Sequence, residues 1–245
     1  IETTTSGYWR VGVHIADVAY FIKADSPLDK EARKRGISIY LRNQVVPILP
    51  DGLSSDYFSL LPEKDRLAIS ILITVNKNGQ IVEFEIEPSV IQVNAHLSYK
   101  ETRKIINGNT NELVNLNLEQ LENAINKLQN VSKALRNARL RRGAFDLNLP
   151  DEKSYYNDES PLGAMINPEI FPARSMVAEL IILANQGIAS HLLALGVPAI
   201  YRVQNSPDPG DIQEFIKLAS NLGADLYIED EEDLQPADYQ AFVQE

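Results

Sequence analysis

The alternation of apolar and polar residues predicts β-strands in the first third of the chain. Tyr8–Ala16 alternates with a period of two, as a half-buried strand does. Two further apolar runs, Leu67–Val75 and Ile81–Ile91, lie on either side of Asn78 and Gly79. Because Asn-Gly tolerates the positive φ of a tight turn, these two runs predict a β-hairpin.

A short helix and a short strand are predicted between the first strand and the hairpin. Ser26 is a typical N-cap, Pro27 suits the first helical position, and Gly36 is a typical helix end. Ser38–Leu41 is a brief strand pattern. Prolines and a glycine then interrupt regular structure over residues 47–55.

Helical spacing dominates the rest of the chain. Leu118–Arg142 carries apolar residues three or four apart, which predicts an amphipathic helix. Met176–Leu195 is apolar almost all round, which predicts a buried helix. The remaining segments predict a loop over 148–172, a strand over 198–204, a helix over 211–222 and the start of a helix over 236–242. The fold class expected is therefore α+β, a mostly antiparallel sheet with packed helices.

Composition indicates the size of the core and the cellular compartment of the chain. Its 245 residues are 44% hydrophobic, enough to bury a substantial core. The absence of cysteine excludes disulfides and thiolate metal sites and fits a reducing compartment. We find no signal peptide and no uninterrupted apolar run of the ~18–20 residues that cross a bilayer. The expectation is a cytoplasmic protein without a membrane span.

Charge is unevenly distributed. A net charge of −11 argues against a polyanionic partner. Residues 225–233 hold six acids and no base, whereas residues 136–142 hold four arginines and no acid. This local basic track is compatible with RNA in a groove, and solvated surface is the alternative interpretation of both runs.

A few residues carry candidate chemistry, each with a structural alternative. Asp17 at a strand end can offer a carboxylate to a hard cation, or can cap the following turn. Glu179 in an apolar helix faces a large desolvation cost unless it is paired, which makes it a site candidate. His14 is more typical of a packed or hydrogen-bonded residue than of a base. Tyr40 and Phe145 are either core aromatics or stacking surfaces.

Several sequence words follow one another in an order that resembles the ribonuclease II / ribonuclease R family of 3′→5′ exoribonucleases. The resemblance covers residues 1–245 as part of one catalytic domain, with the strongest match over 8–205 and a looser one over 206–245. The words are HIADV at His14–Val18, SPLDKEARKRGISIYL at Ser26–Leu41, PILPDGLSSDYFSL at Pro47–Leu60, DRLAIS at Asp65–Ser70, RGAFDLNLPD at Arg142–Asp151, AELIILAN at Ala178–Asn185 and PAIYRV at Pro198–Val203.

The resemblance implies hydrolysis of single-stranded RNA from the 3′ end, with release of nucleoside 5′-monophosphates by two-metal chemistry. The family holds Mg²⁺ with a D-x₅-D-x-D-D-A cluster one strand before HIADV, and it has a phosphate-binding arginine in a later word. This chain contains neither, so we expect a piece of an enzyme that is inactive alone. Small β-barrel RNA-binding domains are expected to flank it in the full-length protein.

The same resemblance assigns roles to residues that this chain retains. Tyr40 matches the tyrosine that packs on the 3′-terminal nucleotide, and Phe145 matches the aromatic that closes the base stack from the other side. Such stacking contributes ~1–3 kcal/mol per base and is indifferent to sequence. Arg142 and Arg202 are the expected phosphate contacts.

Two carboxylates, Asp17 and Glu179, are the candidate catalytic residues. Asp17 is the retained carboxylate nearest to the expected metal cluster and receives a supporting role. The family usually has two acids where this chain has Ala178 and Glu179. The role of Glu179 is therefore either a supporting partner or a contact to the terminal ribose.

Two other classes of function stay open. One is an RNA-binding or regulatory paralogue that has lost its catalytic acids. The other is a scaffold that binds protein through the acidic residues 225–233.

Overall fold

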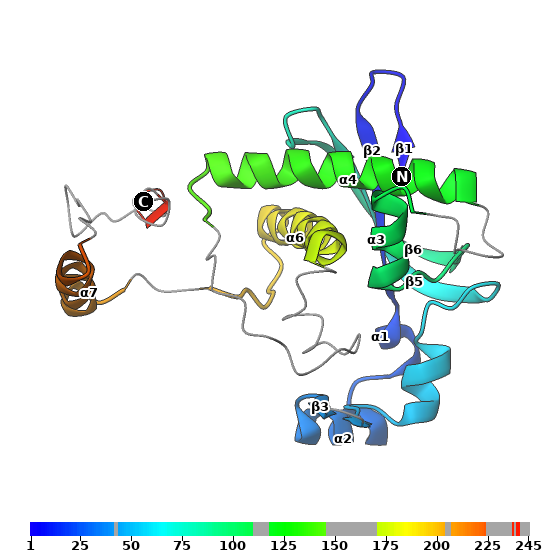
Figure 1. Ribbon diagram of the computed structural model, residues 1–245. Helices are drawn as coiled ribbons and strands as arrows, with labels where there is room; N and C mark the ends of the chain where they lie inside the picture. Colours follow the sequence, from blue (N-terminus) through cyan, green and yellow to red (C-terminus); the bar gives the residue numbers. More distant parts are fainter. Residues whose placement is uncertain are drawn as a thin grey trace.

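The centre of the molecule is an antiparallel sheet with helices on one face (Figure 1). The sheet order is β1-β2-β5-β6, formed by Glu2–Thr3, Trp9–Ala16, Asp65–Val75 and Ile81–Gln92. The computed structural model describes residues 1–41, 44–109, 118–145, 171–203 and 207–223, together with Ala237, Tyr239 and Gln240. The α+β architecture expected from the sequence is confirmed.

The β5–β6 hairpin turns where the Asn-Gly pair predicts it. The Asn76 side chain accepts hydrogen bonds from the backbone N–H groups of Asn78 and Gln80, at 2.9 and 3.1 Å. Gly79 has a φ of +78°, and a Cβ at this position would collide with the carbonyl oxygen of Ala134. Glycine is therefore required both for the turn and for the close approach of a helix.

The segment between β2 and β5 forms a separate small unit. Helix α1 (Val18–Phe21) is followed by α2 (Pro27–Arg35), which begins at the predicted cap Ser26. The predicted strand is β3 (Ile39–Leu41), and it pairs with β4 (Gln44–Val46), which the sequence pattern does not predict. The proline-rich stretch includes a wide helical turn, η1 (Leu53–Tyr57).

The helices that cover the sheet come later in the chain. They are α3 (Tyr99–Ile106), α4 (Leu118–Arg141) and α6 (Phe171–Ala194), while α7 (Pro209–Asn221) lies apart from the sheet in Figure 1. The main core joins β2 and β5 to α4 and α6 through fully buried residues that include Val11, Ile71, Ile73 and Val131. Helix α3 begins with a capping box formed by Ser98 and Glu101.

Helix α6 differs from the buried helix that its composition predicts. Met176, Leu183 and Ala184 are buried, but Ile181 and Leu193 are 49% and 72% exposed. By length and composition alone, Pro172–Ala194 is apolar enough to cross a membrane, although a core helix of a soluble protein passes the same test. The prediction from the sequence rests only on uninterrupted apolar runs. It does not identify this helix, because a few polar residues interrupt its apolar sequence.

Other segments test the remaining secondary-structure predictions. The strand predicted over 198–204 is wrong for residues 198–203, which have no regular structure and no strand partner among the described residues. The described part of the predicted loop, residues 171–172, already belongs to α6, and the rest lies outside the described residues. In the predicted start of a helix over 236–242, Ala237, Tyr239 and Gln240 are helical.

Candidate functional site

Glu179 is held by an arginine from the neighbouring helix. Its side chain is buried, with 4% of the residue exposed, in the third turn of α6. Arg139 of α4 donates from Nη2 to Oε1 at 2.7 Å, and from Nε to Oε1 and Oε2 at 3.2 and 3.3 Å. This forked geometry compensates the buried carboxylate and ties α4 to α6.

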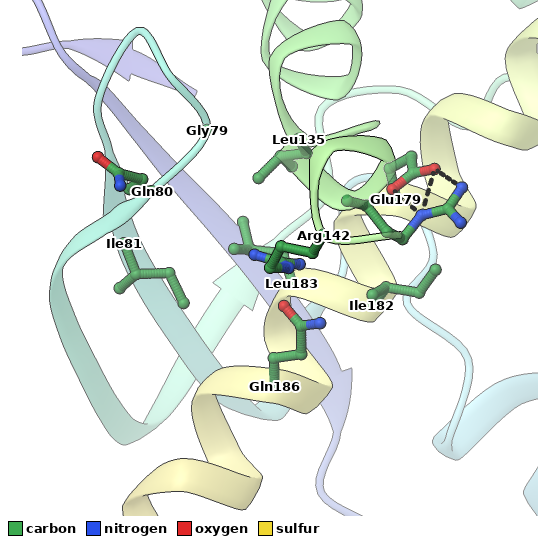
Figure 2. Close-up of a pocket in the computed structure, with 10 residues that line it drawn as sticks. Gly79, Gln80, Ile81, Leu135, Arg142, Glu179, Ile182, Leu183 and Gln186 are labelled. Carbon is green, nitrogen blue, oxygen red and sulfur yellow. Dashed lines mark hydrogen bonds and ion pairs between the residues drawn. The ribbon is translucent and has the colours of Figure 1, made fainter. Parts of the chain in front are cut away.

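A cleft of about 240 Å³ lies next to this ion pair (Figure 2). Its walls come from the β5–β6 turn, the end of α4 and one face of α6. Arg142, Gln80 and Gln186 give it polar groups, while the rest of its lining comes from Gly79, Ile81, Leu135, Arg139, Glu179, Ile182 and Leu183. The cleft therefore combines cationic and amide donors with an apolar floor.

The arginine run before Phe145 is partly engaged in contacts within the protein. Arg139 holds Glu179, and Arg141 donates from Nη2 to the carbonyl oxygen of Asn78 at 2.8 Å. Arg142 is exposed and lines the cleft. Phe145 is 36% exposed, so part of its ring is accessible to a ligand.

Asp17 has a local structural role. Its Oδ1 accepts a hydrogen bond from the backbone N–H of Tyr20 at 3.1 Å and caps helix α1. This is the structural alternative expected for an aspartate at a strand end. Its catalytic role stays a prediction.

Tyr40 lies on the small β3–β4 sheet and is 58% exposed. The residues around it are also exposed and apolar, namely Ile39, Leu41, Val45 and Val46. Arg35 ties this sheet to α2 by donating from Nη1 to the carbonyl oxygen of Pro47 at 2.9 Å. Tyr40 is thus a surface aromatic and not the core residue of the alternative interpretation.

The structure divides the candidate residues into two groups. Asp17 lies beside Leu67 near the start of β5, whereas the cleft reaches Gly79 beyond its end. At ~3.3 Å per residue, the strand between Leu67 and Val75 is roughly 25 Å long. Figure 1 likewise places β3 at the lower end and the C-terminal end of α4 at the upper left. The two predicted carboxylates, Asp17 and Glu179, therefore do not form a pair.

His14 belongs to a polar row on the sheet. Its Nδ1 lies 2.6 Å from Oγ of Ser70, which lies 2.5 Å from Oγ of Ser89. Burial of the ring is the main cause that lowers the pKa of His14, and the positive charge of the amino terminus lowers it further. The hydrogen-bonded role expected for this histidine is the one observed.

The described residues do not fit a metal centre. Within them, no group of three His, Asp or Glu side chains is placed to hold an ion. We therefore assign no metal-dependent step to these residues. Arg202 is exposed and lies outside regular structure.

Two features of the site are not visible in the sequence. Arg139 is 40 positions from Glu179, so no local spacing identifies it as the partner. Gln240 is a further example, because it contacts the end of α4 across about a hundred positions. The desolvation cost of Glu179 indicates only that some partner must exist.

Comparison with known proteins identifies a matching family and several similar sequences. The RNB domain family profile matches residues 1–244. The acetazolamide conferring resistance protein zam of Synechocystis is 36% identical over 232 residues, which are 94% of this chain and 29% of that protein. Ribonuclease R of Vibrio parahaemolyticus is 35% identical over 92% of this chain and 27% of its own length. The chain thus spans less than a third of these two curated relatives.

Solved structures share the fold. RNase R of Mycoplasma genitalium, in complex with ribose-methylated single-stranded RNA, matches with a TM-score of 0.85 and 25% identity, over 98% of this chain and 37% of that one. Yeast Ssd1, a pseudonuclease, matches with a TM-score of 0.70 and 20% identity, over 92% of this chain and 27% of that one. The second likeness concerns the fold alone.

Proposed function

Because the chain belongs to the RNB domain family, we propose that it is part of the catalytic domain of a 3′→5′ exoribonuclease. The substrate would be single-stranded RNA, hydrolysed to nucleoside 5′-monophosphates. The observation that carries this proposal is the match of nearly the whole chain to an RNase R solved with single-stranded RNA. The cytoplasm is the proposed compartment, and flanking RNA-binding β-barrels are proposed for the rest of the full-length protein.

Tyr40 and Phe145 are the proposed stacking residues. Both rings are accessible. Tyr40 lies on β3 and Phe145 follows the C-terminal end of α4, and Figure 1 shows β3 and that end of α4 in different parts of the molecule. The two rings therefore cannot hold the two faces of one base and would instead bound a run of several bases. Because stacking is indifferent to base identity, binding through two aromatic rings suits an enzyme that digests any RNA sequence.

Arg142 and Arg202 are the proposed phosphate contacts. Both are exposed, and Arg142 lies three residues before Phe145. Each contact to a single-stranded backbone adds about −0.7 to the slope of log affinity against log salt. Loss of either arginine would therefore weaken binding and flatten the salt dependence.

Two-metal chemistry with Mg²⁺ is proposed for the full-length protein. When bound, the ions would stabilise the attacking hydroxide and the leaving oxygen. Since the described residues do not fit a metal centre, the ligands are proposed to lie elsewhere in that protein. Asp17 would then support the site, and Glu179 would act in its pair with Arg139.

An RNA-binding paralogue without catalysis is the second candidate. The shared fold of a pseudonuclease makes it a concrete alternative. The two candidates differ in hydrolysis and agree in RNA binding, so a digestion assay separates them.

The test is a single-turnover digestion of 5′-labelled oligo(A) with Mg²⁺ by the full-length protein. Tyr40→Ala is compared with Tyr57→Ala, because these tyrosines are 58% and 60% exposed. We expect a ladder that shortens from the 3′ end, altered by Tyr40→Ala, unaltered by Tyr57→Ala, and absent with residues 1–245 alone. RNA binding without digestion at any Mg²⁺ concentration would favour the paralogue.

A further inference from the structure

Gln240 is bonded to the end of α4, close to Phe145. Its Nε2 donates to the carbonyl oxygen of Leu140 at 3.0 Å and to that of Ala144 at 2.9 Å. A side-chain amide carries two N–H donors, so both bonds can form at once. The Leu140 carbonyl also accepts from the backbone N–H of Gly143 at 3.0 Å, so Gln240 adds a second partner at this helix end.

The second of these bonds fixes the peptide that leads to Phe145. The carbonyl of Ala144 belongs to the same peptide unit as the backbone nitrogen of Phe145. The orientation of this unit therefore determines the position of the Phe145 Cα, from which the side chain extends. The backbone N–H of Ala144 in turn donates to the carbonyl oxygen of Arg139 at 3.2 Å. Both sides of Ala144 are therefore held.

The backbones of the two segments also approach closely at Gly143. This residue has a φ of +91°, and a Cβ here would lie 2.8 Å from the backbone nitrogen of Ala237. Since almost any side chain would force the segments apart, the contact of the end of α4 with Ala237 and Gln240 depends on glycine.

Tyr239 completes the contact by lying against Phe145. The two ring centroids are 6.3 Å apart with an interplanar angle of 32°. This distance is within the range of favourable aromatic pairs. Phe145 nevertheless keeps 36% of its surface exposed, so Tyr239 covers only part of the ring.

We propose that Tyr239 and Gln240 are positioning residues that hold Phe145 as one wall of the RNA-binding surface. The segment that carries them acts as a buttress, with Gln240 fixing the backbone and Tyr239 supporting the ring. This inference rests on the proposed function, because it requires Phe145 to contact RNA.

The test measures the affinity of the full-length protein for oligo(A) with 2-aminopurine near its 3′ end, in EDTA so that metal-dependent hydrolysis is prevented. The variants are Phe145→Ala, Gln240→Ala, Tyr239→Ala and the double variant Phe145→Ala/Gln240→Ala. Gln120→Ala is the matched control, since Gln120 is an exposed glutamine in the first turn of α4. The melting temperature of each variant is recorded in parallel.

We expect Gln240→Ala to weaken binding about threefold to tenfold, which is part of the affinity that one base–aromatic stack contributes. Tyr239→Ala removes the ring that lies against Phe145 and should also weaken binding, whereas Gln120→Ala should bind as the wild type does. The double variant should bind no more weakly than Phe145→Ala, because Gln240 acts through Phe145. A purely structural role would instead make the two losses additive.

The outcomes distinguish two claims, that Phe145 contacts RNA and that Tyr239 and Gln240 hold Phe145 in position. If Phe145→Ala weakens binding and Gln240→Ala does not, or if their losses add, the buttress is refuted while RNA stacking stands. If Phe145→Ala has no effect, the assignment of Phe145 to RNA fails and the buttress fails with it. If Gln240→Ala does not fold, Gln240→Met serves in its place, because methionine keeps the length of the side chain and lacks the two N–H donors, and it must weaken binding.

Discussion

The buried ion pair between Arg139 and Glu179 predicts an asymmetric response to mutation. Arg139→Met removes the cation and leaves a carboxylate that is 5% exposed without its partner. Breaking a buried pair in this way typically costs about 3–5 kcal/mol. Because the Arg139 side chain is 24% exposed and water reaches this side of the pair, we expect the lower end, about 3 kcal/mol.

Removal of the Glu179 carboxylate should lower the free energy of unfolding by less than removal of Arg139 does. After Glu179→Leu, the guanidinium of Arg139 can turn toward solvent, and the expected loss is about 1–2 kcal/mol. The double variant Arg139→Met/Glu179→Leu replaces the pair with apolar groups of similar size. Such replacements are often close to neutral, so the double variant should be more stable than Arg139→Met alone.

Calorimetry of the full-length protein measures these differences in the transition that includes this domain. At about 2–4 °C per kcal/mol for a domain of this size, Arg139→Met should lower the melting temperature by roughly 6–12 °C. Arg33→Met is the matched control, since its ion pair with Asp25 is largely exposed and should contribute below about 1 kcal/mol.

Two results would contradict this account of Glu179. An Arg139→Met variant as stable as Arg33→Met would show that the pair contributes nothing measurable. A stable double variant that binds RNA but has lost hydrolysis would show that the Arg139–Glu179 pair is needed for the reaction and not for stability alone.

Three further predictions concern the turn and the helix caps. Gly79→Ala should destabilise the domain by about 2 kcal/mol or more in calorimetry, because φ is +78° and the new Cβ would meet the Ala134 carbonyl. Hydrogen bonds from the backbone N–H and then the hydroxyl of Ser98 lower the pKa of Glu101, so its contribution is present above its unfolded pKa near 4.5 and lost as pH falls through the folded value. Glu101→Gln should therefore cost roughly 0.5 kcal/mol at pH 7 and less at pH 3 in denaturant titrations, and an equal cost at both pH values would contradict this. Asp17→Asn keeps the cap and should leave the melting temperature unchanged, so a loss of about tenfold in RNA hydrolysis would measure the supporting charge.

The sequence predicts the sheet well because its signals are local. The period of two in β2 and the Asn-Gly turn each act within a few residues, and both are present in the structure. The strand β4 has only three residues and exists through its pairing with β3, so its own pattern carries no signal. The segment 198–203 shows the reverse, an apolar pattern that finds no partner strand among the described residues.

The candidate site was less predictable because its contacts are long-range. Burial of a carboxylate in an apolar helix correctly marks Glu179 as a residue that needs a partner. The identity of that partner depends on how α4 crosses α6, which no spacing in the sequence encodes. The same holds for Gln240, whose two bonds depend on where its side chain meets the end of α4.

The charge distribution indicates how such a surface could bind RNA despite a net charge of −11. Of the arginines at 136–142, Arg139 and Arg141 are already bound to groups of the protein. Of these two charges, only that of Arg139 is offset, by Glu179, because a bond to the neutral carbonyl of Asn78 leaves the charge of Arg141 in place. In the proposed RNA complex, accessible rings such as Tyr40 would add affinity that does not depend on base identity. A grip of this kind is suited to holding RNA of any sequence while the strand advances.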